Sequence, residues 1–204
     1  MHFLITAGGS REYIDPVRFI SNASTGKMGY ALARAAITAG HKVTLITAPT
    51  SLRTPPRAKI ISVETSAQMF EAVKKYFDKC DCLIMAAAVS DYTPVTPSKT
   101  KIKKNRAGLT LKLKPTTDIL KWAGKNKKSR VVVGFALEDK AIRPRAEKKL
   151  KEKNLDMIIA NTTAAIGAET SAVQIKCKDS KWIKFPMSAK STVAGRIIRL
   201  LAEK

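Results

Sequence analysis

The chain has 204 residues, of which 45% are hydrophobic and 26% charged, a composition typical of a globular protein with one substantial core. Its 38 Lys and Arg face 16 Asp and Glu, a formal net charge of +22 that favours nucleic acid, acidic membrane surfaces or polyphosphates as partners. Three cysteines without a C-x-x-C pair and two histidines support neither a disulfide framework nor a zinc site, and they favour no Ser/His or Cys/His nucleophile. No apolar run of about eighteen residues exists for a membrane span, and Met1 leads into the first predicted strand without a leader-like segment. We therefore expect a cytoplasmic protein without a membrane partner.

The first predicted elements are a buried strand at residues 3–7 and a helix at 27–39, joined by an unusually long connection. Strand-to-helix loops usually have about two to six residues, and much longer ones tend to be functional. This connection contains Arg11, Arg18 and Asn22.

Small polar residues lie immediately before this helix, where free N–H groups and the helix dipole favour phosphate or carboxylate: Ser21, Asn22, Ser24, Thr25 and Gly26. An ordinary helix cap after a solvated loop is the alternative. The length of the loop and its arginines favour an anion site over a simple cap.

Further strands and helices alternate along the chain, which predicts an α/β fold: a Rossmann-like, doubly wound, mostly parallel sheet. The helix at 69–79 has a capping box of Thr65 and Gln68, and the helix at 138–153 contains or is divided by Pro144. Strands are expected at 42–47, 59–63, 81–88, 130–135 and 155–160. In such sheets ligands bind at the carboxyl ends of the strands, where the strand order reverses.

Three further segments, 109–113, 172–177 and 182–185, are expected to form a small antiparallel appendage that provides dimerisation strands. Residues 93–108 are predicted to form a surface loop, and Ser188 is predicted to cap a last helix that buries Val193, Ile197, Leu200 and Leu201. Because no clear linker interrupts the chain, residues 1–204 are expected to form a single domain.

Nicotinamide chemistry is disfavoured. Residues 7–10 read AGGS rather than G-x-G-x-x-G, no Asp or Glu ends the second strand to hold a ribose, and no tyrosine is followed by a lysine four residues later.

Six segments occur in a family-specific order: TAGGSRE (6–12), DPVRFISNASTGKMG (15–29), AAAVSD (86–91), KIKK (101–104), GF (134–135), and KLKEKNLD (149–156) leading to AN (160–161). Together they resemble phosphopantothenoylcysteine synthetase (phosphopantothenate–cysteine ligase) of the bacterial, CTP-dependent type, along nearly the whole chain. The flavin-dependent decarboxylase domain that often precedes this domain in bacteria is not in the sequence.

The resemblance implies a ligase of coenzyme A biosynthesis. It implies that CTP activates phosphopantothenate as an acyl-cytidylate with loss of pyrophosphate, and that L-cysteine then displaces CMP. A magnesium ion, a homodimer in which the flap (residues 93–108) completes the neighbour's site, and phosphopantothenoylcysteine decarboxylase as a separate partner are also implied. Magnesium is expected to be held through the nucleotide and Asp91, since no direct metal-ligand cluster is expected.

Site residues carried over from the family fall into three groups. The catalytic group comprises Asn22, Lys101 and Arg18. Nucleotide binding is expected at Met85, Ala86, Ala87, Asp91, Lys101, Thr117, Asp118, Ile119, Leu120, Phe135, Lys149 and Lys153. Binding of the substrate or intermediate is expected at Gly8, Gly9, Ser10, Arg18, Asn22, Ser24, Thr25 and Gly26.

Alternatives remain for several of these residues. Lys101 is also one of twelve basic residues between Lys99 and Arg130, where solvated lysines are expected. The base choice between CTP and ATP rests on the resemblance alone. A basic nucleic-acid-binding module is disfavoured because aromatic residues are sparse and not interleaved with the lysines.

Overall fold

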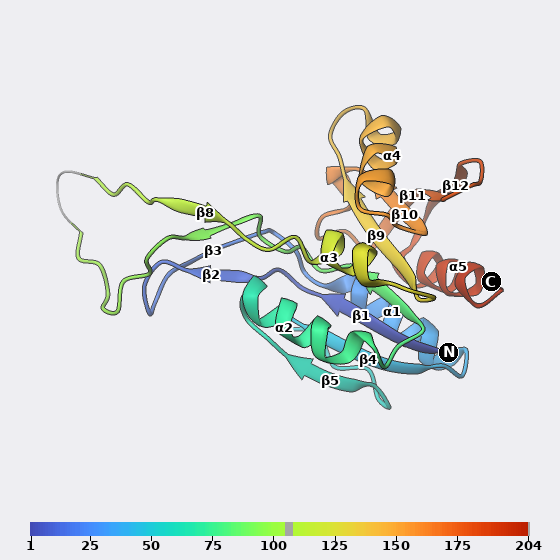
Figure 1. Ribbon diagram of the computed structural model, residues 1–204, viewed down its shortest axis with the longest axis horizontal. Coiled ribbons are helices and arrows are strands. Elements are labelled where there is room, and N and C mark those ends of the chain that lie inside the picture. The colour runs from blue at the N-terminus through green and yellow to red at the C-terminus, as the bar shows by residue number, and fades with distance from the viewer. Residues whose placement is uncertain (105–107, 204) are drawn as a thin grey trace.

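The computed structural model describes residues 1–104 and 108–203, so residues 105–107 of the predicted flap lie outside the described part. Its centre is an eight-stranded sheet with the order β12-β11-β10-β9-β6-β1-β4-β5 (Figure 1). Six neighbouring strands are parallel, and β11 and β12 extend the sheet in antiparallel pairing. The strands are β1 (His2–Ala7), β4 (Lys42–Thr47), β5 (Lys59–Ser62), β6 (Cys82–Met85), β9 (Val131–Leu137), β10 (Met157–Asn161), β11 (Thr170–Cys177) and β12 (Ile183–Ala189).

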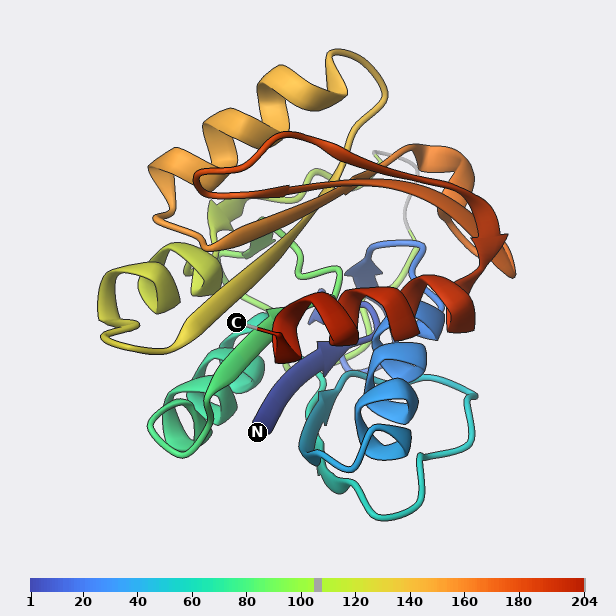
Figure 2. The same cartoon turned by 90° about the vertical axis from the view of Figure 1, so that its right-hand side faces the viewer.

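Helices cover both faces of the sheet, as Figure 2 shows. One layer contains α1 (Lys27–Thr38) and α5 (Lys190–Ala202). The other contains α2 (Ser66–Phe77), α3 (Ile119–Asn126) and α4 (Ile142–Glu152), and a short 3₁₀ turn, η1 (Thr163–Ala165), follows β10. In β1, Phe3 and Ile5 pack toward α1 and α5 while Leu4 packs toward α2, the alternation of a strand buried on both faces.

Two small antiparallel hairpins form an arm that projects from the body of the molecule (Figure 1). One consists of β2 (Arg11–Tyr13) and β3 (Phe19–Ser21), inside the long connection after β1. The other consists of β7 (Tyr92–Pro94) and β8 (Leu113–Pro115), which flank the flap. Strands β2 and β7 contact each other, so the connection after β1 and the base of the flap are joined.

The structure confirms the fold class and all six predicted parallel strands within a few residues. The capping box is confirmed as well, because Gln68 N–H donates to Thr65 Oγ1 and the Gln68 side chain accepts from the Thr65 N–H. Among the described residues, no helix has the length and apolar character needed to cross a bilayer.

Several local predictions were wrong. The segments 172–177 and 182–185 form the antiparallel pair β11 and β12 as expected, at the edge of the main sheet. The strand expected at 109–113, however, begins only at Leu113 and pairs with β7. The cap of α5 is Ala189, since the Ser188 hydroxyl donates to the Pro186 carbonyl instead. Helix α4 starts four residues later than predicted, after Ala141 in a left-handed conformation, so Pro144 lies harmlessly in its first turn.

Other departures concern burial and an unpredicted helix. Leu200, predicted to be buried, is only half-buried; of the three cysteines, Cys80 and Cys82 are buried and Cys177 is half-buried. Helix α3 was not predicted at all.

Candidate active site

The strand order of the sheet reverses between β1 and β6, because the chain proceeds from β1 to β4 on one side and returns to β6 on the other. The loops after these two strands are bonded to each other at this point. Ser10 N–H donates to the Ala88 carbonyl at 3.2 Å, and Ala88 N–H donates to the Gly8 carbonyl at 2.9 Å. The loops after β1 and β6 therefore meet at the carboxyl edge of the sheet, where the strand order reverses.

Two glycines at this edge lie so close to neighbouring backbone that a side chain would not fit. Gly8 has φ +82, and a Cβ there would lie 2.9 Å from the Ala48 carbonyl oxygen. A Cβ on Gly9 would lie 2.8 Å from the Asn22 carbonyl oxygen, so the segment with Asn22 folds directly over the end of β1. Ser10 is wholly buried and its hydroxyl accepts from Ser90 N–H at 3.0 Å, a role in joining the two loops.

Asn22 reaches across the crevice between these loops. Its Nδ2 donates to the carbonyl oxygens of Ala88 and Val89, both at 3.2 Å. The amide oxygen of Asn22 accepts no hydrogen bond from any other group among the described residues, which leaves it directed to solvent or a ligand. Asn22 therefore joins the loop after β1 to the loop after β6, where the strand order reverses.

The start of α1 has no side-chain cap. Gly26 is the N-cap with φ 77, and Ser24 Oγ accepts from the Gly26 N–H at 3.3 Å rather than from the helix. The first N–H groups of α1 are therefore left for an external acceptor, as the sequence predicted for an anion site. Gly26 lies beside Gly8, because a Cβ on Gly26 would be 3.3 Å from the Gly8 nitrogen.

Hydrogen bonds to other residues hold the Arg18 side chain in place. Its guanidinium binds the buried Asp15 carboxylate, with Nε 2.9 Å from Oδ2, and its Nη2 donates to the Ile102 carbonyl at 2.6 Å. The hydrogen bond from Arg18 holds the pKa of Asp15 well below its usual range, despite the opposing effect of burial. Lys101 is exposed, one residue from this contact, and has no hydrogen-bonded or ionic partner among the described residues.

A cavity of about 170 Å³ lies where the carboxyl ends of β6 and β9 meet the start of α3 and the end of α4. All the predicted nucleotide-binding residues line it except Ala86 and Lys101. Val89 and Thr116 also line it and were not predicted, although Val89 lies inside the AAAVSD motif. The full lining is Met85, Ala87, Val89, Asp91, Thr116, Thr117, Asp118, Ile119, Leu120, Phe135, Lys149 and Lys153.

Two lysines from one end of α4 supply the positive charge of this cavity. Lys149 Nζ donates to the Phe135 carbonyl at 2.7 Å, and Lys153 Nζ lies 2.8 Å from Asp118 Oδ2. Burial, with a smaller contribution from Lys153, lowers the pKa of Lys149. Asp118 in turn caps α3 by accepting from Lys121 N–H at 2.9 Å. Lys153 is the C-cap of α4 rather than a residue within it, but both ammonium groups reach the same cavity as predicted.

Carboxylates able to hold a metal are sparse here. Among the described residues, no group of three or more His, Cys, Asp or Glu could bind a metal ion. Asp91 is exposed, lines the cavity and forms no ion pair with the described residues, so its carboxylate has the donor chemistry to share a magnesium ion with nucleotide phosphates.

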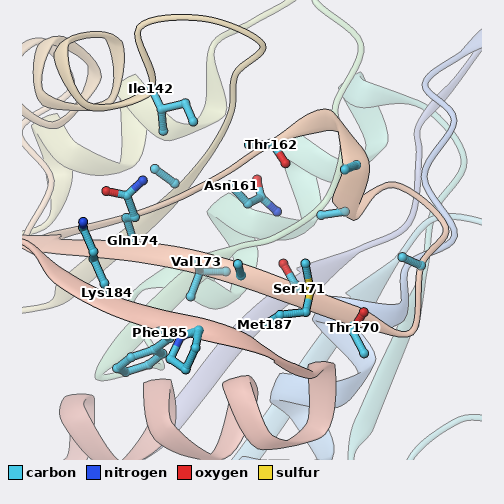
Figure 3. Close-up of a pocket in the computed structure, with 16 residues that line it drawn as sticks. Ile142, Asn161, Thr162, Thr170, Ser171, Val173, Gln174, Lys184, Phe185 and Met187 are labelled. Carbon is cyan, nitrogen blue, oxygen red and sulfur yellow. The ribbon is translucent and has the colours of Figure 1, made fainter.

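A different cavity, of about 450 Å³, lies over the β11–β12 edge (Figure 3). Figure 3 shows Asn161 and Thr162 above it and Phe185 and Met187 below. Lys184 is the one charged residue among those lining it, and none of the predicted site residues reaches it. Its lining does not suit a polyphosphate, so the charged cavity beside the loop after β6 is the better candidate.

Comparison with known proteins agrees with this assignment. Residues 1–204 match the family described as DNA/pantothenate metabolism flavoprotein C-terminal domain. The chain is 48% identical over 206 residues to the coenzyme A biosynthesis bifunctional protein CoaBC of Bacillus subtilis (strain 168), covering 98% of this chain and 51% of that protein. The CoaBC protein of Borreliella burgdorferi is 43% identical over 202 residues, covering 97% of this chain and 51% of the relative. The chain thus spans about half the length of these curated relatives.

A solved C-terminal domain of CoaBC superposes with a TM-score of 0.85 at 38% identity, covering 99% of this chain and 96% of that one. The resemblance predicted from the sequence motifs is confirmed at the level of the domain. The chain belongs to the family of the DNA/pantothenate metabolism flavoprotein C-terminal domain.

Proposed function

We propose that this chain is a phosphopantothenate–cysteine ligase of coenzyme A biosynthesis that uses CTP and an acyl-cytidylate intermediate. The observation that carries the proposal is the cavity with Lys149 and Lys153, which adjoins the Asn22 loop through Val89. The match to the C-terminal domain of CoaBC over 99% of the chain supports the same reaction class.

The reaction needs two anions side by side. A carboxylate oxygen of phosphopantothenate attacks the α-phosphorus of CTP and pyrophosphate leaves; the cysteine amine then attacks the acyl carbon, loses a proton, and CMP leaves. Both steps require positioning and charge neutralisation rather than a protein nucleophile. Cations in the cavity, unpaired N–H groups at α1 and the absence of a nucleophile–base pair in the motifs suit this chemistry.

Individual roles follow from position. Lys149 and Lys153 bind the nucleotide phosphates, and Phe135 lies at the edge of the same cavity against base or sugar. Asn22 holds the acyl-nucleotide through its amide, which donates and accepts without ionising. Lys101 approaches from the flap to neutralise charge as pyrophosphate leaves. Magnesium, held by Asp91 and the triphosphate, would supply further neutralisation of phosphate charge.

The exposed arm is the proposed dimer surface. It carries six exposed large hydrophobic residues on its two hairpins and flap: Val17, Phe19, Tyr92, Val95, Leu109 and Leu113. Burial of these side chains against a second copy would bring a flap close to a neighbouring site. Sedimentation should show a dimer at working concentration, and Leu113→Glu with Tyr92→Lys should shift it to monomer. A monomeric parent protein would contradict the proposal.

The phosphopantothenoylcysteine decarboxylase is the proposed partner, because it consumes the product of this reaction. A direct test of the activity is pyrophosphate release from phosphopantothenate, magnesium and either CTP or ATP, followed by mass spectrometry after cysteine is added. We expect release with CTP and formation of phosphopantothenoylcysteine. Release with ATP but not with CTP would show that ATP is the nucleotide substrate, and no release with either would reject the ligase proposal.

A further inference from the structure

Asp15 is a buried carboxylate to which the proposed function assigns no role. Its side chain is 0% exposed and accepts hydrogen bonds from two separate segments. Oδ1 accepts the N–H groups of Val17 at 2.9 Å and Arg18 at 2.8 Å, which closes the turn of the β2–β3 hairpin. Oδ2 accepts Arg18 Nε at 2.9 Å and the Ile102 N–H at 3.1 Å. The carboxylate therefore joins the hairpin to the flap.

Arg18 completes the same junction. Its Nη2 binds Asp15 Oδ2 and also donates to the Ile102 carbonyl at 2.6 Å. Both backbone hydrogen-bonding groups of Ile102 are thus held by one pair of side chains. A second attachment lies four residues earlier, where Ser98 N–H donates to the Ile14 carbonyl at 2.8 Å. Residues 98–102, the flap limb, are fastened along the turn at residues 14–18.

The location of this junction links two site residues. Lys101 directly precedes Ile102, and the turn leads through β3 to Asn22. A lysine on an unattached loop would sample many positions, with a large loss of conformational entropy on binding. Fixing its backbone removes much of that loss before substrate arrives, which is how preorganised sites gain rate.

We propose that Asp15 and Arg18 are positioning residues that hold the Ile102 peptide and so fix the flap backbone from which the Lys101 ammonium reaches the site. The proposal rests on the proposed catalytic function of Lys101. Arg18 then acts mainly through the flap, because Asp15 and Ile102 occupy its Nε and Nη2 donors. Lysine could replace the charge of Arg18 but not its planar fork, so Arg18→Lys should behave like a loss of the junction.

A double-mutant cycle tests this proposal. Asp15→Asn should lower kcat for pyrophosphate release by about tenfold while KM for the nucleotide changes by less than about twofold, since the nucleotide cavity is not altered. On a Lys101→Gln background the same substitution should lower kcat by less than about twofold, because the group that it positions is gone. An equal fractional loss in both backgrounds, or no loss in the parent, would overturn the proposal.

Amide hydrogen exchange gives a readout that does not depend on activity. Exchange at Ile102 should accelerate by about tenfold or more in Asp15→Asn, and unchanged protection would also overturn the proposal. If the parent protein releases no pyrophosphate, the ligase proposal fails while this exchange result still decides whether the pair holds the flap. If Asp15→Asn does not fold, Ile102→Pro removes the same flap N–H and leaves the Asp15–Arg18 pair intact.

Asp156→Asn is the matched control. Asp156 also accepts from a lysine, Lys127 Nζ at 2.6 Å, and from a main-chain N–H, Val132 at 2.8 Å. It lies before β10, at the opposite end of the sheet from the flap. Its substitution should reduce stability without changing amide exchange at Ile102 or the kcat of the folded fraction. If Asp156→Asn lost both the protection of Ile102 and kcat, the effect of Asp15→Asn would not be specific.

Discussion

Lys153 Nζ lies 2.8 Å from Asp118 Oδ2 in the wall of the cavity of about 170 Å³, so the residue that ends α4 is tied to the residue that begins α3. Asp118 also accepts from Lys121 N–H at 2.9 Å. One carboxylate therefore caps a helix and orients a cation of the site.

Separating these two roles of Asp118 gives a first prediction. Asp118→Asn keeps an oxygen for the cap but loses the ion pair, whereas Asp118→Ala loses both. Alanine should cost about 1 kcal/mol of unfolding free energy more than asparagine, measured by urea denaturation. Equal costs would show that the cap contributes nothing.

The same carboxylate predicts an acid dependence. Burial raises the pKa of Asp118, but the hydrogen bonds from Lys153 and Lys121 outweigh it, and the pKa lies below the ordinary 3.8. The ionised form is thus favoured by folding, so its contribution is present above pH 3.8 and lost as pH falls through the lowered pKa. Asp118→Asn should flatten this part of the stability curve, and an unchanged acid limb would contradict it.

Lys149 predicts an alkaline effect on both nucleotide affinity and stability. Burial lowers its pKa from the ordinary 10.5, so the buried ammonium loses its proton at a lower pH than a surface lysine. Nucleotide affinity should fall over that range, while the unfolding free energy of the ligand-free protein should rise, because the unfolded chain binds more protons. Calorimetric titration at several pH values checks both.

Lys149→Arg, which stays charged, should remove the alkaline fall in affinity. The control is Lys148→Gln, since the Lys148 side chain is 73% exposed. If the control variant changed the pH profile as strongly as Lys149→Arg, the assignment to Lys149 would be wrong.

The contact between α3 and the end of α4 predicts the effect of Gly124→Ala. A Cβ on Gly124 would lie 1.8 Å from the Lys153 carbonyl oxygen, so the helices must separate and Lys153 must move from the cavity. The clash should lower the unfolding free energy by about 1–3 kcal/mol, even after the higher helix propensity of alanine is allowed for. The displacement of Lys153 should also raise the KM for the nucleotide. Gly195→Ala in α5 is the control, because its Cβ meets nothing within 4 Å and should stabilise by about 0.5–1 kcal/mol.

Asn22→Asp should damage turnover more than folding. The new carboxylate would face the Ala88 and Val89 carbonyl oxygens, which now accept from Nδ2, and would repel the anionic intermediate. We expect kcat to fall by about a hundredfold, the effect of losing a donor at a developing charge. Asn126→Asp removes a similar donor, 2.8 Å from the Trp122 carbonyl, far from the crevice, and should leave kcat unchanged. Normal turnover in Asn22→Asp would refute the role.

Sequence patterns predicted the sheet because its strands are short, apolar and bounded by turn residues. Most of the residues that the family resemblance assigns to nucleotide binding line one cavity. Helix α3 was missed because ILKWAGKN is short and contains lysines and a glycine; the signal that could have found it was Asp118 as an N-cap. Ser188 was mistaken for a cap because β12 continues to Ala189 through pairing with β11.

The Asp15–Arg18–Ile102 junction joins residues 84 or more positions apart, so no local pattern could predict it. Its partners meet only because two hairpins from different loops pack side by side. The same holds for Lys153 and Asp118, whose approach depends on the packing of α3 against α4.

Phosphopantothenate labelled with ¹⁸O in its carboxylate shows whether a carboxylate oxygen attacks the α-phosphorus of CTP. We expect CMP to acquire one ¹⁸O for each phosphopantothenoylcysteine formed. CMP without the label, or label in inorganic phosphate with CDP as the nucleotide product, would contradict it.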